Sequence, residues 1–246
     1  MFLKAKLRLI FGSLDIGNRL RQKQILSLIR HFHPSFKSIL DAGCGGGVCA
    51  LRLAHRYPGS QLVGLDYDIY NVKQAQTDQK VLKIKNVEFR HGDLRTSLGE
   101  NKYDLIYCID VLEHINSDEK VLYNFFAALK QNGNLIIHVP LLNQRRVFKC
   151  FNDWSQADHV RDGYEKESLV KMLERQGFAV IYRKYTFGWV GALAWELDEI
   201  FRGLSSVARV MAFPALALLG GLDLRLRSDW GNGILIFATK EFQRTT

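Results

Sequence analysis

The sequence predicts an α/β protein with a doubly wound, largely parallel sheet, and two patterns lead to this prediction. A short apolar run at 38–40 enters a glycine cluster, Gly43 to Gly47, and an amphipathic segment follows from Val48 to Tyr57. This is the order of strand, tight turn and helix. Farther on, Tyr103 to Asp110 is largely apolar, as a central parallel strand covered on both faces should be.

The glycine cluster indicates a ligand that lies against backbone N–H groups at a helix N-terminus. Gly43 and Gly45 fit the start of a dinucleotide fingerprint, but Val48 stands where its third small residue belongs. Asp41, just before the turn, would repel a pyrophosphate and attract an ammonium or a sulfonium group. S-adenosylmethionine carries both cations, and its carboxylate suits the helix N-terminus. A ligand-free connection is disfavoured, because clustered glycines lower stability unless something approaches closely.

These residues bring the chain close to a known family. The loop at 40–47 reads LDxGCGxG, and further landmarks follow in order at 62–66, 91–94, 103–115 and 129–140. In these motifs the chain resembles the class I S-adenosylmethionine-dependent methyltransferases, in particular their small-molecule, type 11-like branch. The resemblance runs from Gln22 to Thr186 and resumes at Trp230. It implies a methyltransferase with a Rossmann-like seven-stranded sheet whose last strand is antiparallel.

Composition limits the other possibilities. The 246 residues, 47% of them hydrophobic, are enough for one substantial core, so disorder is not expected. The formal net charge is +9, with an early cluster of bases opposed only by Asp15. That cluster comprises Lys4, Lys6, Arg8, Arg19, Arg21, Lys23, Arg30 and Lys37. It indicates either a polyanionic neighbour, nucleic acid or an anionic membrane surface, or merely a solvated basic face.

The cysteines and the N-terminus bear on location. The 4 cysteines form no C-x-x-C pair, which favours a reducing compartment and no zinc site. The first residues alternate basic and apolar side chains, a poor signal peptide. We therefore expect a cytoplasmic protein, with peripheral attachment to the inner face of the membrane as the open alternative.

Taken in order, the chain divides into four parts. Residues 1–37 form basic amphipathic helices, at 2–11 and 18–31, and residues 38–187 form the donor-binding core. Residues 188–229 are an apolar helical insertion, and 230–246 complete the core with its last strand at 234–239. Within the core we expect strands at 38–40, 61–66, 86–91, 103–110, 134–139 and 178–187. The intervening helices are expected at 48–57, 69–84, 117–133 and 164–176, with Gly133 and Gly177 at the ends of the last two.

The donor site follows from the strand ends. Asp66 ends the second strand about 20 residues beyond the loop, where a parallel neighbour presents a carboxylate to ribose hydroxyls; a helix cap is its alternative role. The resemblance implies that Asp93 contacts the adenine amino group. The full set of expected donor contacts is Asp41, Gly43, Cys44, Gly45, Asp66, Tyr67, Asp93, Leu94 and Ile109.

The sulfonium donor is already activated, so the protein must align the acceptor and remove its proton, and no metal is required. A long segment, 141–163, with Arg145, Arg146, Trp154, His159 and Arg161, is expected to cover the sheet edge as a lid. The candidate catalytic residues are His159 in the lid, and His114 and Glu113 after the fourth strand. Each histidine has a purely structural alternative.

The insertion departs from the family pattern, which joins the last two strands by a short hairpin. Ser206 to Leu222 is apolar apart from Arg209, and Pro214 and Gly220-Gly221 are expected to interrupt it. It could pack in a homodimer, cover a hydrophobic acceptor, or enter a membrane. In the membrane case, Arg202, Arg209, Arg225 and Arg227 would lie at the headgroups.

The acceptor is inferred by exclusion. No Asn/Asp-Pro-Pro-aromatic run follows the fourth strand, and no Pro-Cys pair occurs, so the motifs of enzymes that methylate adenine or cytosine amino groups, or cytosine C5, are absent. We expect O-methylation of a small-molecule or lipid-like acceptor, with nucleic acid disfavoured. The alternatives are a non-catalytic membrane-associated protein that retains the fold, an RNA methyltransferase and, least favoured, a nicotinamide oxidoreductase.

Overall fold

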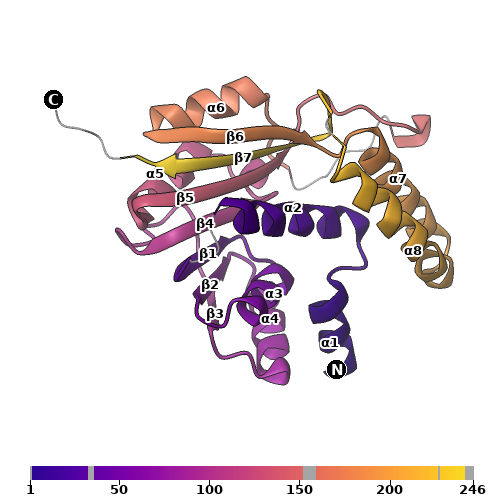
Figure 1. Ribbon diagram of the computed structural model, residues 1–246, viewed down its shortest axis with the longest axis horizontal. Helices are drawn as coiled ribbons and strands as arrows, with labels where there is room; N and C mark the ends of the chain where they lie inside the picture. Colours follow the sequence, from indigo (N-terminus) through magenta and orange to yellow (C-terminus); the bar gives the residue numbers. More distant parts are fainter. Residues whose placement is uncertain (1, 33–35, 152–158, 227, 242–246) are drawn as a thin grey trace.

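The computed structural model describes residues 2–32, 36–151, 159–226 and 228–241, and within them one seven-stranded sheet dominates (Figure 1). The strand order is β3-β2-β1-β4-β5-β7-β6. The strands are β1 (Ser38–Ala42), β2 (Gln61–Asp66), β3 (Val87–His91), β4 (Tyr103–Ile109), β5 (Leu129–Pro140), β6 (Phe178–Thr186) and β7 (Gly233–Lys240). Strand β7 runs antiparallel to both neighbours. The predicted fold class, including the antiparallel last strand, is confirmed.

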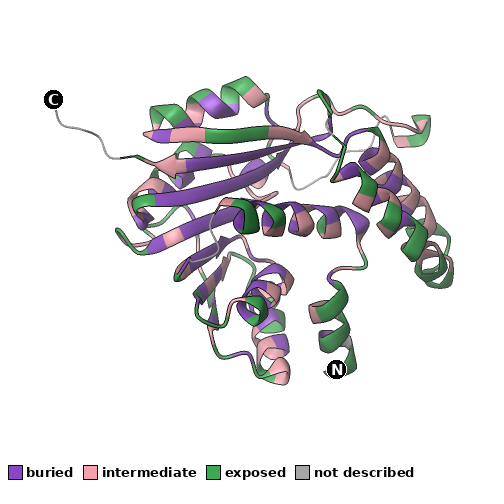
Figure 2. Ribbon diagram, viewed as in Figure 1, coloured by how far each residue is buried: buried purple, intermediate pink, exposed green. Residues whose placement is uncertain are grey.

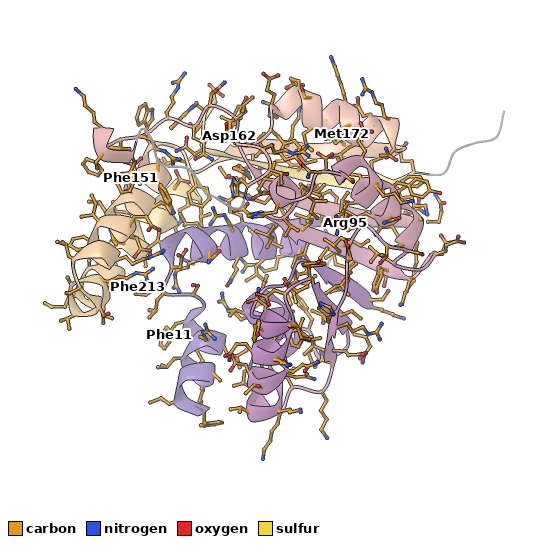
Figure 3. The ribbon with its side chains drawn as sticks, turned by 180° about the vertical axis from the view of Figure 1, so that it is seen from behind. Phe11, Arg95, Phe151, Asp162, Met172 and Phe213 are labelled. Carbon is orange, nitrogen blue, oxygen red and sulfur yellow. The ribbon has the colours of Figure 1, made fainter. Side chains whose placement is uncertain are left out.

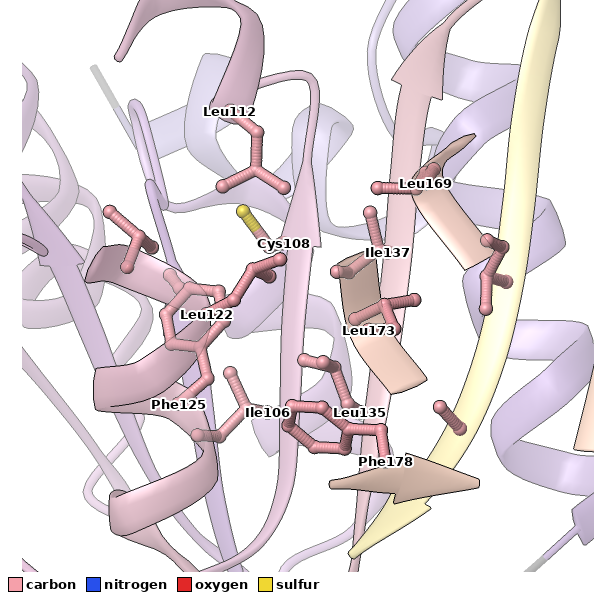
Figure 4. Close-up of a cluster of buried hydrophobic side chains, with 14 of the residues drawn as sticks. Ile106, Cys108, Leu112, Leu122, Phe125, Leu135, Ile137, Leu169, Leu173 and Phe178 are labelled. Carbon is pink, nitrogen blue, oxygen red and sulfur yellow. The ribbon is translucent and has the colours of Figure 1, made fainter. Parts of the chain in front are cut away.

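Helices cover both faces of this sheet. They are α1 (Phe2–Phe11), α2 (Ile16–Phe32), α3 (Val48–Arg56), α4 (Ile69–Leu82), α5 (Asp118–Ala128) and α6 (Lys166–Arg175) in the core region. Helices α2, α3 and α4 bury their apolar residues against one face, and α5 and α6 bury theirs against the other. Figure 4 shows this second layer, where Phe125 of α5 and Leu169 of α6 meet Ile106 and Ile137 of the central strands. The central strands β1, β4, β5 and β7 are mostly buried between the layers, whereas the edge strands β3 and β6 are more exposed (Figure 2).

The prediction for α5 and β5 was partly wrong. Helix α5 ends at Ala128 rather than Gly133, and β5 begins at once. Leu129 pairs with Tyr103, the register then shifts, and pairing resumes between Asn134 and Leu105. Gly133 lies in this irregularity, where a Cβ would stand 2.7 Å from a backbone oxygen. The glycine therefore permits a β-bulge instead of ending a helix.

The insertion is a helical hairpin of α7 (Trp189–Leu204) and α8 (Ser206–Asp223). These helices form a small hydrophobic cluster with α2, separate from the two clusters on the sheet. Helix α8 continues through Pro214, against the expected interruption. Pro214 lies on the exposed side, where water can bond the carbonyl group that proline leaves unpaired. Gly220 lets α8 approach α2 closely, because a Cβ there would lie 2.7 Å from Leu20.

Candidate functional site

The carboxyl ends of β1, β2 and β4 meet at one edge of the sheet and border a cavity of about 630 Å³, here called the loop cavity. Its lining consists of Gly43, Gly45, Asp66, Tyr67, Asp68, Asn71, Asp93, Leu94, Arg95, Ile109, Asp110, Val111, His114, Ile115 and Asn116. Seven of the nine predicted donor contacts are in this set. An open α/β sheet binds its ligands at this edge.

The glycine loop is shaped for close approach by a ligand. Gly43 and Gly45 have φ angles of 80° and 51°, in the left-handed region that side chains disfavour. A Cβ on Gly43 would lie 2.2 Å from Val111, whereas a Cβ on Gly45 would meet no atom within 4 Å. Open space in front of Gly45 and packing behind Gly43 leave the loop backbone open to close approach by a ligand.

Asp66 fastens the loop to the neighbouring strand. Its carboxylate accepts hydrogen bonds from the backbone N–H groups of Gly45 at 2.7 Å and Asp68 at 2.9 Å. The cap of α4 is Asp68, whose side chain accepts from Tyr70 N at 2.8 Å. Asp66 is thus not the helix cap that its alternative role required. It lines the cavity with two oxygens already oriented by backbone donors.

Asp93 lies across the cavity, paired with Arg95 at 2.6 Å. Hydrogen bonds from the Arg95 side chain hold the pKa of Asp93 below its ordinary value. The carboxylate is therefore charged at neutral pH and available to accept a bond from an amino group. Its contact with adenine stays a prediction.

Asp41 and Cys44 lie behind the cavity wall. Asp41 is 3% exposed, and its Oδ2 atom has no hydrogen-bond partner. Burial raises the pKa of Asp41 to about 7. This buried carboxylate lies beneath the loop with one oxygen lacking a hydrogen-bond partner. It would attract a cationic ligand above the loop electrostatically, without touching it. Cys44 is also buried, its side chain belongs to the hydrophobic cluster on the α3 and α4 side, and burial raises the pKa of its thiol; its contact with the donor stays a prediction.

A second, smaller cavity of about 280 Å³ adjoins the first and is here called the polar pocket. Helices α2 and α7, the end of β4 and the lid segment contribute its lining. The lining is Asp15, Asn18, Arg21, Asp110, Glu113, His114, His138, Pro140, Gln144, Arg146, His159, Phe187, Ala192, Trp195, Glu199, Arg202 and Asn232. Asp110 and His114 line both cavities, so the two spaces meet at these residues.

The three predicted catalytic residues come together at this junction. The side-chain ligand atoms of Glu113, His114 and His159 all lie within 4.8 Å of one another, and the two imidazole rings are 4.6 Å apart. A backbone bond from Val160 N to Glu113 O, 3.0 Å, ties the lid to the turn after β4. This composition could also hold a metal ion. Trp154, predicted in the lid, lies outside the described residues.

The sequence prediction missed a charged group beside this cluster. His138 in β5 bonds Asp110 at 2.5 Å through Nδ1 and Thr186 at 2.9 Å through Nε2. Arg21 of α2 forms an ion pair with the same aspartate. Burial would raise the pKa of Asp110, but the charges of Arg21 and His138 outweigh burial and lower it. The sequence feature that could have revealed His138 is that it is a histidine near the end of an otherwise apolar strand.

Comparison with known proteins identifies the family. The family model described as "Methyltransferase domain" matches residues 18–183, most of the chain. The chain belongs to this methyltransferase family. Its sheet order and glycine loop make it a class I S-adenosylmethionine-dependent methyltransferase.

Relatives agree on the family and differ in acceptor. The methyltransferase is 32% identical over 130 residues to ubiquinone biosynthesis O-methyltransferase of Rickettsia akari, covering 52% of this chain and 51% of that one. It is 31% identical over 157 residues to release factor glutamine methyltransferase of Aliivibrio fischeri, covering 60% and 54%. The chain thus spans about half the length of the curated relatives it matches.

The fold is also shared with phosphoethanolamine N-methyltransferase 2 of Haemonchus contortus, solved with S-adenosylmethionine. The TM-score is 0.67 at 18% identity, over 98% of this chain and 60% of that one. At this identity the likeness shows the fold.

The insertion of the methyltransferase holds the lid in place. Glu196 of α7, fully buried, accepts hydrogen bonds from Val147 N at 2.8 Å and Phe148 N at 2.7 Å. Asn232, which follows the insertion, accepts a hydrogen bond from Arg145 N at 2.9 Å and donates one to Arg145 O at 2.8 Å. These contacts fix the start of the lid over the polar pocket. The insertion is therefore part of the site's architecture.

Proposed function

We propose that this methyltransferase transfers the methyl group of S-adenosylmethionine to a hydroxyl oxygen of a small or lipid-like acceptor in the polar pocket. The observation that carries the proposal is the junction of the two cavities. They meet at Asp110 and His114, with Glu113 and His159 alongside. A donor in the loop cavity and an acceptor in the polar pocket would meet there.

The donor-binding roles are assigned from the lining. Asp66 receives the ribose hydroxyls, Asp93 the adenine amino group, and the loop backbone at Gly43 and Gly45 the methionine portion. Tyr67, Leu94 and Ile109 supply apolar contact around the adenosine. When bound, S-adenosylmethionine supplies an electrophilic methyl group on a sulfonium.

The acceptor side needs a proton acceptor and fixed positioning. His159 or His114 takes the hydroxyl proton at Nδ1 or Nε2, since a neutral imidazole carries a nitrogen lone pair that can accept a proton. Glu113, buried beside them, orients the rings. Asp110, held charged by Arg21 and His138, stabilises an imidazolium that forms nearby.

Oxygen is favoured as the acceptor atom for two reasons. The chain has no base-gripping motif after β4, and several relatives near 31% identity are ubiquinone biosynthesis O-methyltransferases. A phenolic or enolic hydroxyl group fits a pocket with imidazoles. A lipid-like acceptor further suits the apolar insertion, with the enzyme acting in the cytoplasm at the inner face of the membrane.

The deciding experiment supplies the protein with methyl-labelled S-adenosylmethionine and an extract of its source cells, and then partitions the products. Label is expected in the organic phase. Reagents that cleave methyl ethers should release the new methyl group from this product. Label only in aqueous products would redirect the acceptor toward a soluble metabolite, a sugar or RNA. Label in no product, with donor binding intact, would favour a non-catalytic protein that retains the fold.

His159→Ala tests the base. We expect the turnover number to fall about 100-fold or more, the usual contribution of a positioned base, while donor affinity is unchanged. His31→Ala, exposed near the end of α2 and outside both the loop cavity and the polar pocket, is the matched control and should leave turnover unaltered. If chelators abolish the wild-type activity and a divalent ion restores it, Glu113, His114 and His159 are metal ligands instead.

A further inference from the structure

Helices α1 and α8 expose apolar side chains to a degree unusual for a monomeric protein (Figure 2). On α8, Val207, Met211 and Leu218 are 69%, 77% and 68% exposed. The other large apolar side chains exposed on these two helices are Phe2, Leu3, Leu7, Ile10, Phe11, Val210 and Leu222, and Leu204 at the end of α7 is exposed beside them. Together these residues are here called the apolar face.

The two helices contribute to one surface. Arg19 of α2 bonds the carbonyl oxygen of Phe11 at the end of α1, and its guanidinium lies 5.2 Å from the ring centre of Phe213 on α8. Figure 3 shows Phe11 and Phe213 close to one another on the same side of the molecule, and Figure 1 shows α1 and α8 there from the other direction. Helix α6 lies at the opposite side.

A cationic groove borders this surface. It measures about 370 Å³ between α1, α2 and α3, and Ile10 belongs to both the groove and the apolar face. The lining of this basic groove is Leu9, Ile10, Lys23, Leu26, Arg30, Arg52, His55 and Arg56. Among the described residues, the lining includes no carboxylate. Burial, and then the neighbouring Arg19 and Arg52, lower the pKa of Lys23, so like charges are held together there.

Helix α8 is long and apolar enough to cross a membrane, but its inner side is bound to the protein. Arg209 donates two hydrogen bonds of 2.8 Å to buried Asp198, and Asp223 accepts one from Gly191 N at 3.0 Å. One side of α8 is thus committed to α7 and α2. Its exposed side can enter only the boundary of a bilayer, lying along the surface.

Charge and polarity together select the occupant. A second copy of the chain would bring cations against cations, and a nucleic acid would leave the apolar face in water. A bilayer with anionic lipids satisfies both, because acyl chains receive the apolar side chains and phosphates receive the bases.

We propose that the apolar face and the basic groove bind an anionic membrane, with α1 and α8 in its surface and a phospholipid phosphate in the groove. The polar pocket opens beside this surface, since Asp15 and Arg202 of its lining adjoin exposed Leu14 and Leu204. A lipid-like acceptor thus enters the pocket from the bilayer; this last step rests on the proposed function.

The test is co-sedimentation of the full chain with vesicles, without donor or acceptor. Vesicles of phosphatidylcholine alone are compared with vesicles that also contain phosphatidylglycerol. The groove variant is Lys23→Glu with Arg56→Glu, and the face variant is Val210→Asp with Leu218→Asp. The matched controls are Lys171→Glu with Arg175→Glu on α6, and Ile181→Asp on β6, all exposed on other elements.

We expect the wild type and both controls to bind the anionic vesicles preferentially. The groove variant should lose about 30-fold or more in partition, from two basic groups near the surface, and the face variant should lose binding to both vesicles. S-adenosylmethionine titration shows that each variant is folded. Vesicle binding needs no methyl transfer. A negative result here would therefore reject membrane binding without rejecting the proposed methyl transfer.

Three results would overturn the proposal. The first is equal binding of wild type and groove variant to anionic vesicles. The second is a stable dimer that the face variant dissociates, which would make the apolar face a subunit interface. The third is salt-sensitive RNA binding through the groove with no vesicle binding, which would make it a nucleic-acid site.

Discussion

At the scale of single residues, Asp66 shows how a regular pattern fixes a position. Parallel strands end at one edge of the sheet, so an acid at the end of β2 must face the loop after β1. The structure adds that this carboxylate already binds Gly45 N and Asp68 N. Asp66 therefore shapes the loop and, in the proposed function, also receives the ribose, so its removal should affect donor binding twice.

Asp66→Ala should weaken S-adenosylmethionine binding by about tenfold or more, as expected for a hydrogen bond to a charged group. Isothermal titration measures the change. Asp68→Ala provides the comparison: it removes the cap of α4 and should lower stability by about 1 kcal/mol with little change in affinity. If both variants lost affinity equally, Asp66 would act through α4 and not through the donor.

Asp41 makes the stability of the ligand-free protein depend on pH. Burial raises its pKa from 3.8 to about 7, so the folded state keeps a proton that the unfolded state loses at lower pH. The loss of folding stability caused by burying Asp41 therefore grows as pH rises from about 4 to about 7. Above that pH it is constant, at about 4 kcal/mol. Asp41→Asn should remove it, so the variant should gain stability over wild type at pH 8 but not at pH 4. Denaturant titrations at the two pH values decide this, and a difference independent of pH would contradict it.

Other residues of the site could not be foreseen. Arg21 reaches Asp110 from α2, and where a helix outside the strand-and-helix repeat docks depends on packing that periodicity does not encode. His138 is in a buried parallel strand whose two faces look alike in sequence. Asp41 and Cys44 show the converse: the sequence placed them at the loop, but the strand directs their side chains behind it.

At the scale of elements, most strands were predictable within a residue or two because apolar runs and turn residues bound them. The exceptions have local causes. The end of α5 shifted because β5 absorbs the extra residues in a bulge, and Pro214 did not interrupt α8 because the freed carbonyl faces water. At α5 the pairing of distant strands outweighed local propensity, whereas at Pro214 solvent exposure removed the cost of the missing hydrogen bond.

The insertion and the lid form one element, joined by Glu196. Glu196→Ala would leave the N–H groups of Val147 and Phe148 without their partner, and should cost about 2–4 kcal/mol of stability. It should also raise the KM for acceptor about tenfold while donor affinity stays unchanged. Glu174→Gln, exposed on α6, is the control. Equal changes in donor and acceptor binding would mean that Glu196 supports the whole fold and not the lid.

At the scale of the molecule, the two cavities, the insertion and the basic helices occupy one side of the sheet edge. The carboxyl ends of the strands border the loop cavity, whereas α2 and α7 line the polar pocket, and α1 and α8 carry the apolar face. The sequence identified the first because the motifs are local. It left the acceptor open because that pocket is assembled from segments far apart along the chain.

The same division predicts which ligands stabilise the whole protein. Any ligand that binds only the folded state adds about 2.7 kcal/mol at 100 times its Kd, which for a chain of this size raises Tm by about 5–10 °C. S-adenosylmethionine and its demethylated product should both do so in thermal unfolding. At pH 8, where Asp41 is mostly ionised, NAD should not, because Asp41 beneath the loop repels a pyrophosphate and Gly45 opens on a cavity that carries Asp66 and Asp93. Stabilisation by NAD of the same size would reassign the loop to a dinucleotide. Asp41→Asn tests the cause: without that charge, S-adenosylmethionine should bind more weakly and NAD should bind more tightly.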